Sequence, residues 1–219
     1  MPRQKKDLEG FAEDRRKSAG PAGQPSVTAP ARGAAQKSGS AEAGQLKQAL
    51  APKPTPEAAR KQMLDTLFER LRQASDPEAA QRIAESIERL WLQSQSDTAN
   101  LLMQRAAASV MARQYPLALS LLDRLVALEP DWAEAWNQRA TTRFLNGDAD
   151  GAMADIDRVI KLEPRHFGAL SGMGMILQGA GLNKSALQIF NQVLAIYPRE
   201  ADIRKLTEKL TLEVEGQDI

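Results

Sequence analysis

Residues 133–166 read AEAWNQRATTRFLNGDADGAMADIDRVIKLEPRH. Two residues of this stretch, Pro164 and Ala152, have equivalents along the chain at intervals of 34 residues. They stand at Pro130, Pro164 and Pro198 and at Ala118, Ala152 and Ala186. Because two independent marks share one period, the sequence predicts three repeats, at 99–132, 133–166 and 167–200.

Each repeat is expected to form two helices joined by a short turn. Small residues at repeat positions 8 and 20 let the two helices approach closely. An apolar residue two places before each proline buries the end of the second helix, and the proline then stops that helix. Each helical pair leaves one face uncovered, so the repeats must stack on one another and the ends of the stack need capping helices.

The pattern resembles that of the tetratricopeptide repeat family, which has a large apolar residue at position 4, a small one at 8, glycine near 15, alanine at 20, an aromatic or aliphatic residue at 24 and proline at 32. The second repeat carries these residue types as Trp136, Ala140, Gly147, Ala152, Ile156 and Pro164. The departures are Arg113 at position 15 of the first repeat and Leu125, Val159 and Val193 at position 27, where the family has alanine. The resemblance implies an all-α fold, a short right-handed α-solenoid of stacked helical hairpins.

The residues on either side of the repeats predict further helices. Thr55-Pro56-Glu57 and Asp76-Pro77-Glu78 each combine a capping side chain, a proline at the first helical position and an acid near the positive end of the helix dipole. We therefore expect a hairpin over residues 55–95, with helices at 56–74 and 77–94. This hairpin would cap the end of the stack beside the first repeat. Apolar residues at helical spacing in 201–215 predict the capping helix at the other end.

The first 54 residues are predicted to be a disordered basic tail. Residues 1–55 carry ten Lys and Arg against five Asp and Glu, whereas residues 56–219 carry nineteen against twenty-three. Prolines and glycines interrupt the tail, and one aromatic residue, Phe11, gives it little to bury. Its clusters, Lys5-Lys6 and Arg15 to Lys17, favour a solubilising role over contact with nucleic acid or an anionic surface, which is the alternative function.

Composition argues against an enzyme. The chain has no cysteine, which excludes thiolate metal sites and thiol nucleophiles, and it has one histidine, His166, which is expected to be a helix-turn residue. We expect no metal, no cofactor and no small-molecule substrate. No signal peptide or membrane span is visible in the sequence, which predicts a cytoplasmic protein, although the lack of cysteine suits a periplasm equally well.

The resemblance implies a concave groove lined by the first helix of each repeat, chiefly from positions 2, 5, 9, 12 and 13, in which a protein or peptide partner lies. Carried onto this sequence, these positions supply the candidate groove residues Met103, Val110, Met111, Asn137, Thr141, Phe144, Leu145 and Met175. The surface is apolar and contains methionines, which adapt to irregular partners. Members that bind a terminal carboxylate use Lys, Arg and Asn on these helices, and that clamp looks absent here.

Two alternatives to an open groove remain. The chain's own tail or neighbouring helices cover the apolar residues, or a second copy of the chain does so and the protein forms a homo-oligomer. The sequence does not distinguish these arrangements.

Charges recur inside the first two repeats and are absent from the third. Position 7 holds Arg105 and Arg139, and position 25 holds Asp123 and Asp157, whereas the third repeat has Met173 and Asn191 there. This covariation predicts two structural ion pairs, Arg105 with Asp123 and Arg139 with Asp157, each within its own repeat.

Overall fold

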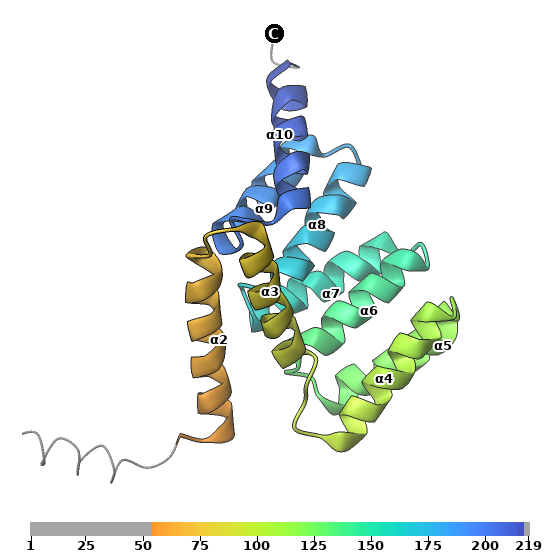
Figure 1. Cartoon of the computed structure of the whole chain (residues 1–219). Coiled ribbons are helices and arrows are strands. Elements are labelled where there is room, and N and C mark those ends of the chain that lie inside the picture. The colour runs from red at the N-terminus through yellow and green to blue at the C-terminus, as the bar shows by residue number, and fades with distance from the viewer. Residues whose placement is uncertain (1–53, 217–219) are drawn as a thin grey trace, which may run out of the picture. The chain divides into compact units, whose positions relative to one another are not determined.

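The computed structural model describes residues 54–216, which belong to one compact unit. The described part of the chain contains helices and no strand (Figure 1). In order, the helices are α2 (Pro56–Arg72), α3 (Pro77–Trp91), α4 (Asp97–Met111), α5 (Tyr115–Leu128), α6 (Ala133–Leu145), α7 (Ala149–Leu162), α8 (Phe167–Gly179), α9 (Asn183–Ile196) and α10 (Ala201–Gly216). The predicted disordered basic tail lies outside the described residues, apart from Pro54.

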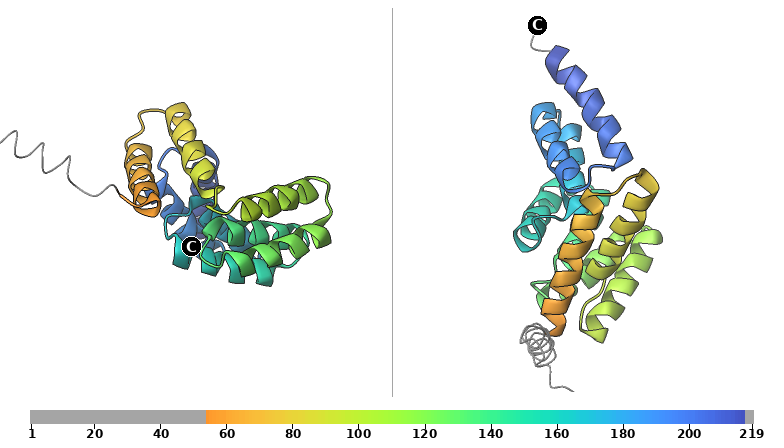
Figure 2. Two further views of the ribbon diagram at one scale, coloured as in Figure 1. Left: turned by 90° about the horizontal axis from the view of Figure 1, so that it is seen from below. Right: turned by 60° about the vertical axis from the view of Figure 1, so that its left-hand side comes forward.

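The repeats form an α-solenoid of three helical pairs, α4–α5, α6–α7 and α8–α9, stacked in chain order (Figures 1 and 2). In the second and third pairs, positions 3, 7 and 10 of the first helix face the preceding pair. In α8 these positions are Ala169, Met173 and Ile176, which pack into the core cluster of α6–α7. The solenoid fold predicted from the 34-residue period is confirmed.

The turns inside the three pairs share one backbone conformation. Position 15 has a positive φ in all of them, at Arg113 (57°), Gly147 (86°) and Gly181 (77°). Glycine adopts this left-handed conformation without steric cost, whereas arginine does not. The departure of the first repeat from the family pattern at Arg113 therefore changes the residue and keeps the turn.

The predicted N-caps of the hairpin are present. The Thr55 side chain accepts a hydrogen bond from the Ala58 amide, and Asp76 accepts one from the Ala79 amide at 2.7 Å. Both helices begin at the expected proline and end two or three residues earlier than expected, at Arg72 and Trp91. At the other end, α10 packs on α9 and buries Ile203 and Leu210, as expected of a capping helix.

The position of the hairpin differs from the expectation. It does not share a core with the first repeat, because its buried residues join the core of the third repeat and α10 (Figure 2). α2 packs against α9, and Arg165 in the α7–α8 turn donates to Asp65 of α2 at 2.7 Å. Leu101 and Arg105, at positions 3 and 7 of α4, are consequently exposed, whereas the equivalent residues of α6 and α8 are buried at position 3 and partly buried at position 7. The α3–α4 connection is long enough to carry the hairpin across the turns between repeats.

Position 8 of the third repeat is glycine because position 24 is large. The first two repeats combine alanine at 8 with Leu122 or Ile156 at 24, while the third combines Gly174 with Phe190. Phe190 is fully buried, and a Cβ built on Gly174 would overlap its ring. The two positions compensate one another in volume, which keeps the distance between α8 and α9 short.

Replacing Gly174 by alanine is expected to lower the free energy of unfolding by roughly 1–3 kcal/mol, because the Phe190 ring must move in a packed core. The matched change at Gly179, on the same helix with no atom within 4 Å of the new Cβ, is expected to raise it by up to about 1 kcal/mol. Urea unfolding monitored by circular dichroism measures both. Adding Phe190→Leu to Gly174→Ala should recover part of the loss, and equal effects of the two glycine changes would contradict this account.

Candidate functional site

The hairpin α2–α3 borders the half of the predicted groove that lies near the start of each first helix. Trp91 stacks on His166 with ring centroids 4.1 Å apart, and the His166 ring lies 3.0 Å from the carboxylate of Glu134 in the first turn of α6. At the end of α3, Leu92 and Gln93 line a pocket together with Met103 of α4. The first turns of α4, α6 and α8 therefore face the chain's own hairpin.

His166 is held by hydrogen bonds on both ring nitrogens. It is the N-cap of α8, since its Nδ1 accepts from the Ala169 amide at 3.1 Å. Nε2 then carries the proton and donates to Glu134, which also accepts from Gln138. Ser171, the nearest hydroxyl in sequence, donates to the Phe167 carbonyl. The histidine is therefore a turn residue that fixes α8 against α6.

Met103 corrects one expectation for the groove. Its side chain is 5% exposed and packs in the core of the first repeat with Leu122 and Val126. Position 5 of α4 is buried because the α3–α4 connection and α6 close over it. Met103 forms the floor of a pocket and is not available as a protruding anchor.

The other candidates remain accessible and lie toward the end of the first helices. Met111 is 87% exposed, Phe144 47% and Met175 49%, and Leu145 and Thr141 are exposed as well. Val110 and Asn137 are half-buried. We call Met111, Phe144, Leu145 and Met175 the apolar row. It consists of large side chains that the hairpin leaves uncovered on three consecutive first helices.

Arg139 binds two carboxylates, one from its own repeat and one from the preceding repeat. Its guanidinium donates to both carboxylate oxygens of Asp155, at 2.9 and 2.7 Å, and to Asp123 at 2.9 Å. Arg143 approaches the same Asp155 carboxylate at 3.0 Å. The hydrogen bonds to Asp155 hold the pKa of Arg139 above its ordinary value, while burial opposes them. The arginine also lies over the Trp136 ring at 4.7 Å.

Both predicted ion pairs are wrong in their partners. Asp123 pairs with Arg139 of the following repeat, so this contact joins two repeats. Asp157 pairs with Lys161 one turn later on the exposed face of α7. Arg105 is exposed and makes no ion pair with any residue that the structure describes. Position 7 faces the preceding repeat, and the first repeat has no preceding repeat to supply an acid.

Asp155 was not identified from the sequence as the partner of Arg139, although a comparison of the repeats indicates that its carboxylate is buried. It stands at position 23, where the other repeats have Leu121 and Ile189, and its side chain is 3% exposed. A carboxylate at a position that is apolar in the sister repeats indicates a buried charge that needs a partner. Arg143 gives the same indication, since its counterparts are Ser109 and Leu177.

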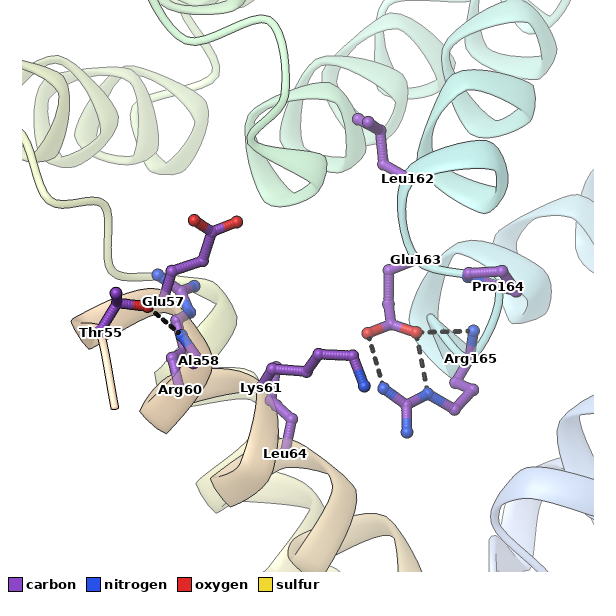
Figure 3. Close-up of a pocket in the computed structure, with 10 residues that line it drawn as sticks. All are labelled: Thr55, Glu57, Ala58, Arg60, Lys61, Leu64, Leu162, Glu163, Pro164 and Arg165. Carbon is purple, nitrogen blue, oxygen red and sulfur yellow. Dashed lines mark hydrogen bonds and ion pairs between the residues drawn. The ribbon is translucent and has the colours of Figure 1, made fainter. Parts of the chain in front are cut away.

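A pocket of about 730 Å³ lies between the start of α2 and the α7–α8 turn (Figure 3). Figure 3 shows Glu163 and Arg165 joined by hydrogen bonds on one side, with the Lys61 side chain directed toward them. Arg60 donates to the carbonyl oxygens of Leu90 and Gln93. Arg165 also donates to Asp65 of α2, so the charges of the turn side of the pocket are used within the turn and in docking the hairpin.

No group of carboxylates and imidazoles arranged to hold a metal ion is found among residues 54–216. Within the same residues, none of the helices is long and apolar enough to cross a membrane. Nothing in the described part of the chain points to catalysis.

Comparison with known proteins places the chain beside repeat proteins. The sequence profile of the tetratricopeptide repeat matches residues 143–210. A TPR repeat-containing protein of Rhizobium etli is 44% identical over 154 residues, which span 68% of this chain and 76% of that protein.

Solved structures agree with the fold. The ArsTM double mutant of MamA RS-1 superposes with a TM-score of 0.52 at 26% identity, covering 57% of this chain and 69% of that one. The TPR2B domain of yeast Sti1, solved as its pHsp70 complex, has a TM-score of 0.50 at 16% identity and covers 54% of this chain and 99% of that one. At that identity the second likeness shows the fold alone.

Asp155→Ala is expected to lower the free energy of unfolding by about 3 kcal/mol, because it leaves Arg139 and Arg143 beside an empty buried position while Asp123 compensates in part. The matched variant Asp157→Ala removes an exposed pair and should change it by less than about 1 kcal/mol. Double-mutant cycles with Arg139→Ala, measured by urea unfolding, should give a larger coupling for Asp155 than for Asp157. A larger coupling of Arg139 to Asp157 than to Asp155 would contradict the structure and favour the pairing inferred from the sequence.

Proposed function

The chain belongs to the tetratricopeptide repeat family, and we propose that it binds a protein partner, as a non-enzymatic scaffold or adaptor, on the open half of its concave face. The observation that supports this most directly is the apolar row. Met111, Phe144, Leu145 and Met175 come from three successive first helices and remain exposed, although the buried residues of the same helices pack in the cores of the repeats. Neighbouring large apolar side chains left in water typically mark an interaction surface.

The half of the concave face that the hairpin covers supports binding of the partner on the other half. With Glu134 bound by His166 and Met103 in the core, groove position 2 of the second repeat and groove position 5 of the first offer little free surface to a partner. A segment that follows the groove is therefore directed along the later turns of the first helices. Rigid stacking of the three pairs would hold its binding surface in place before the partner arrives, which lowers the entropic cost of binding.

The chemistry of this surface favours an apolar segment over a terminal carboxylate. In family members that grip a carboxylate, basic and amide side chains stand at groove positions that hold Met103, Ala107 and Gly172 in this chain. The Sti1 domain was solved with pHsp70, yet its likeness to this chain extends to the fold alone. The partner is therefore inferred from the groove itself, as an amphipathic helix or extended segment with bulky apolar side chains.

The paired substitution Phe144→Glu with Met175→Glu is expected to abolish capture of the partner from source cells by the full chain, because two carboxylates would have to be buried against an apolar segment. Mild cross-linking and mass spectrometry identify the captured proteins. Leu117→Glu is the matched control, since Leu117 is exposed to the same degree but lies on α5, outside the apolar row. Its capture profile should equal that of the unchanged chain.

Two outcomes would contradict the proposal. If the Phe144→Glu, Met175→Glu chain retained every captured protein, the apolar row would not be the binding surface. Capture that disappears between low and physiological salt would instead indicate association through the basic tail with nucleic acid or an anionic surface. A change in oligomeric state between the unchanged and the doubly substituted chain, read by light scattering, would identify a second copy as the partner.

A further inference from the structure

The stack of repeats begins with the pair α4–α5, and the outer side of this pair is open (Figure 1). In the second and third pairs, position 3 of the first helix packs on the preceding pair and is alanine, 0% exposed at Ala135 and 1% at Ala169. Position 3 of α4 is Leu101, which is 48% exposed. The hairpin α2–α3 does not cover this side, because it packs on the third repeat.

Four exposed residues of α4 share this open face. They follow one another at intervals of three or four positions, so their side chains lie on one side of the helix. In chain order they are Asp97, Leu101, Arg105 and Ala108. We call them the α4 stripe.

The two charged residues of the stripe are unused within the chain. Neither the Asp97 carboxylate nor the Arg105 guanidinium forms an ion pair or a side-chain hydrogen bond with any residue between 54 and 216. Arg139, the equivalent of Arg105 in the second repeat, extends to Asp123 of the preceding pair at 2.9 Å. An arginine at position 7 therefore reaches the unit stacked before its own, and Arg105 has no such unit in the described part of the chain.

The stripe is complementary to a second copy of itself. Leu101 stands midway between Asp97 and Arg105, four residues from each. If two α4 helices pack antiparallel about a two-fold axis at Leu101, the two leucines face one another and each Arg105 lies opposite the Asp97 of the other copy. The contact then has an apolar centre and two ion pairs. A parallel arrangement would bring like charges together, so the charges select the antiparallel one.

The residue types of the stripe favour a second copy over the other occupants of this face. A further helical pair of the same kind would need a small residue at position 3, as in the second and third repeats, and Leu101 is too large for that close approach. The basic tail has no net attraction to a stripe with one acid and one base. In the antiparallel arrangement, the small side chain of Ala108 leaves room for the turn before α4 of the other copy.

We propose that two copies of the chain associate through the α4 stripe and form a symmetric dimer. Because one helix from each copy makes the central contact, the interface is small and the dimer forms in a concentration-dependent manner. The α4 stripe and the apolar row have no residue in common, so this inference does not depend on the function proposed above.

Charge reversal tests the pairing of Asp97 with Arg105. Sedimentation equilibrium of the full chain at several concentrations measures the dissociation constant of the dimer. Asp97→Arg alone and Arg105→Asp alone should each raise this constant at least about tenfold, because each variant places like charges opposite one another twice in the dimer. A mixture of the two variants should associate again, since one stripe then carries two bases and the other two acids.

Arg204 and Glu208 provide the matched control. They are a base and an acid at the same spacing of four residues, both exposed, on α10. Arg204→Asp and Glu208→Arg should leave the dissociation constant unchanged. Circular dichroism verifies that each variant keeps the helical content of the unchanged chain.

The absence of cysteine from the chain permits a test of the register. Leu101→Cys places a thiol beside the two-fold axis, so oxidised glutathione should link two copies through this position. Leu212→Cys is the control, because Leu212 is 74% exposed on α10 and is therefore more accessible than Leu101. It should give much less linked dimer.

Three results would overturn the proposal: a chain that stays monomeric up to about 1 mM, equal linkage through the two cysteines, or failure of the mixed charge variants to associate. The groove is tested separately. The Phe144→Glu, Met175→Glu chain should dimerise as the unchanged chain does, and Arg105→Asp should still capture the partner. Loss of the dimer in the Phe144→Glu, Met175→Glu chain would assign self-association to the apolar row and overturn the role of the α4 stripe.

Discussion

The contact between Trp91 and His166 determines how the rest of the unit is arranged. The indole lies at the end of the hairpin and stacks on a histidine whose two nitrogens are used to cap α8 and to bind Glu134 of α6. The Trp91 carbonyl also accepts from the Trp132 indole at 2.7 Å. One residue, through its ring and its backbone carbonyl, thus joins the hairpin to the turns of two repeats. Which half of the concave face is covered, and which stays open, follows from this attachment.

Most of the repeat architecture could be predicted, because the residues that define it act locally. A proline every 34 residues, small residues at positions 8 and 20, and the N-caps Thr55 and Asp76 of the hairpin helices specify helices and turns within a few residues of themselves. The attachment of the hairpin could not be predicted in this way. It depends on contacts such as Asp65 with Arg165, which are one hundred residues apart and leave no period in the sequence.

The candidate site was predictable to a similar extent. A comparison of repeat positions gave the exposed members of the groove, but it could not show that Met103 is covered, because burial there comes from outside the repeat. The ion pairs failed for a related reason. Position 7 was matched with an acid of its own repeat, while the structure uses Asp155 in that repeat and Asp123 of the preceding one. A charged residue between two stacked repeats can pair with residues of either repeat, so a comparison within one repeat does not identify its partners.

The return of α2 onto α9 changes the class of folding behaviour expected of the chain. In an open solenoid each repeat contacts its neighbours only, so stability is close to a sum of local terms and the ends fray independently. Here the first described helix packs against the next-to-last one, which closes a long-range contact between elements far apart in the chain. Closure couples the terminal elements, raises the contact order and makes folding slower and more nearly all-or-none than the repeat count suggests.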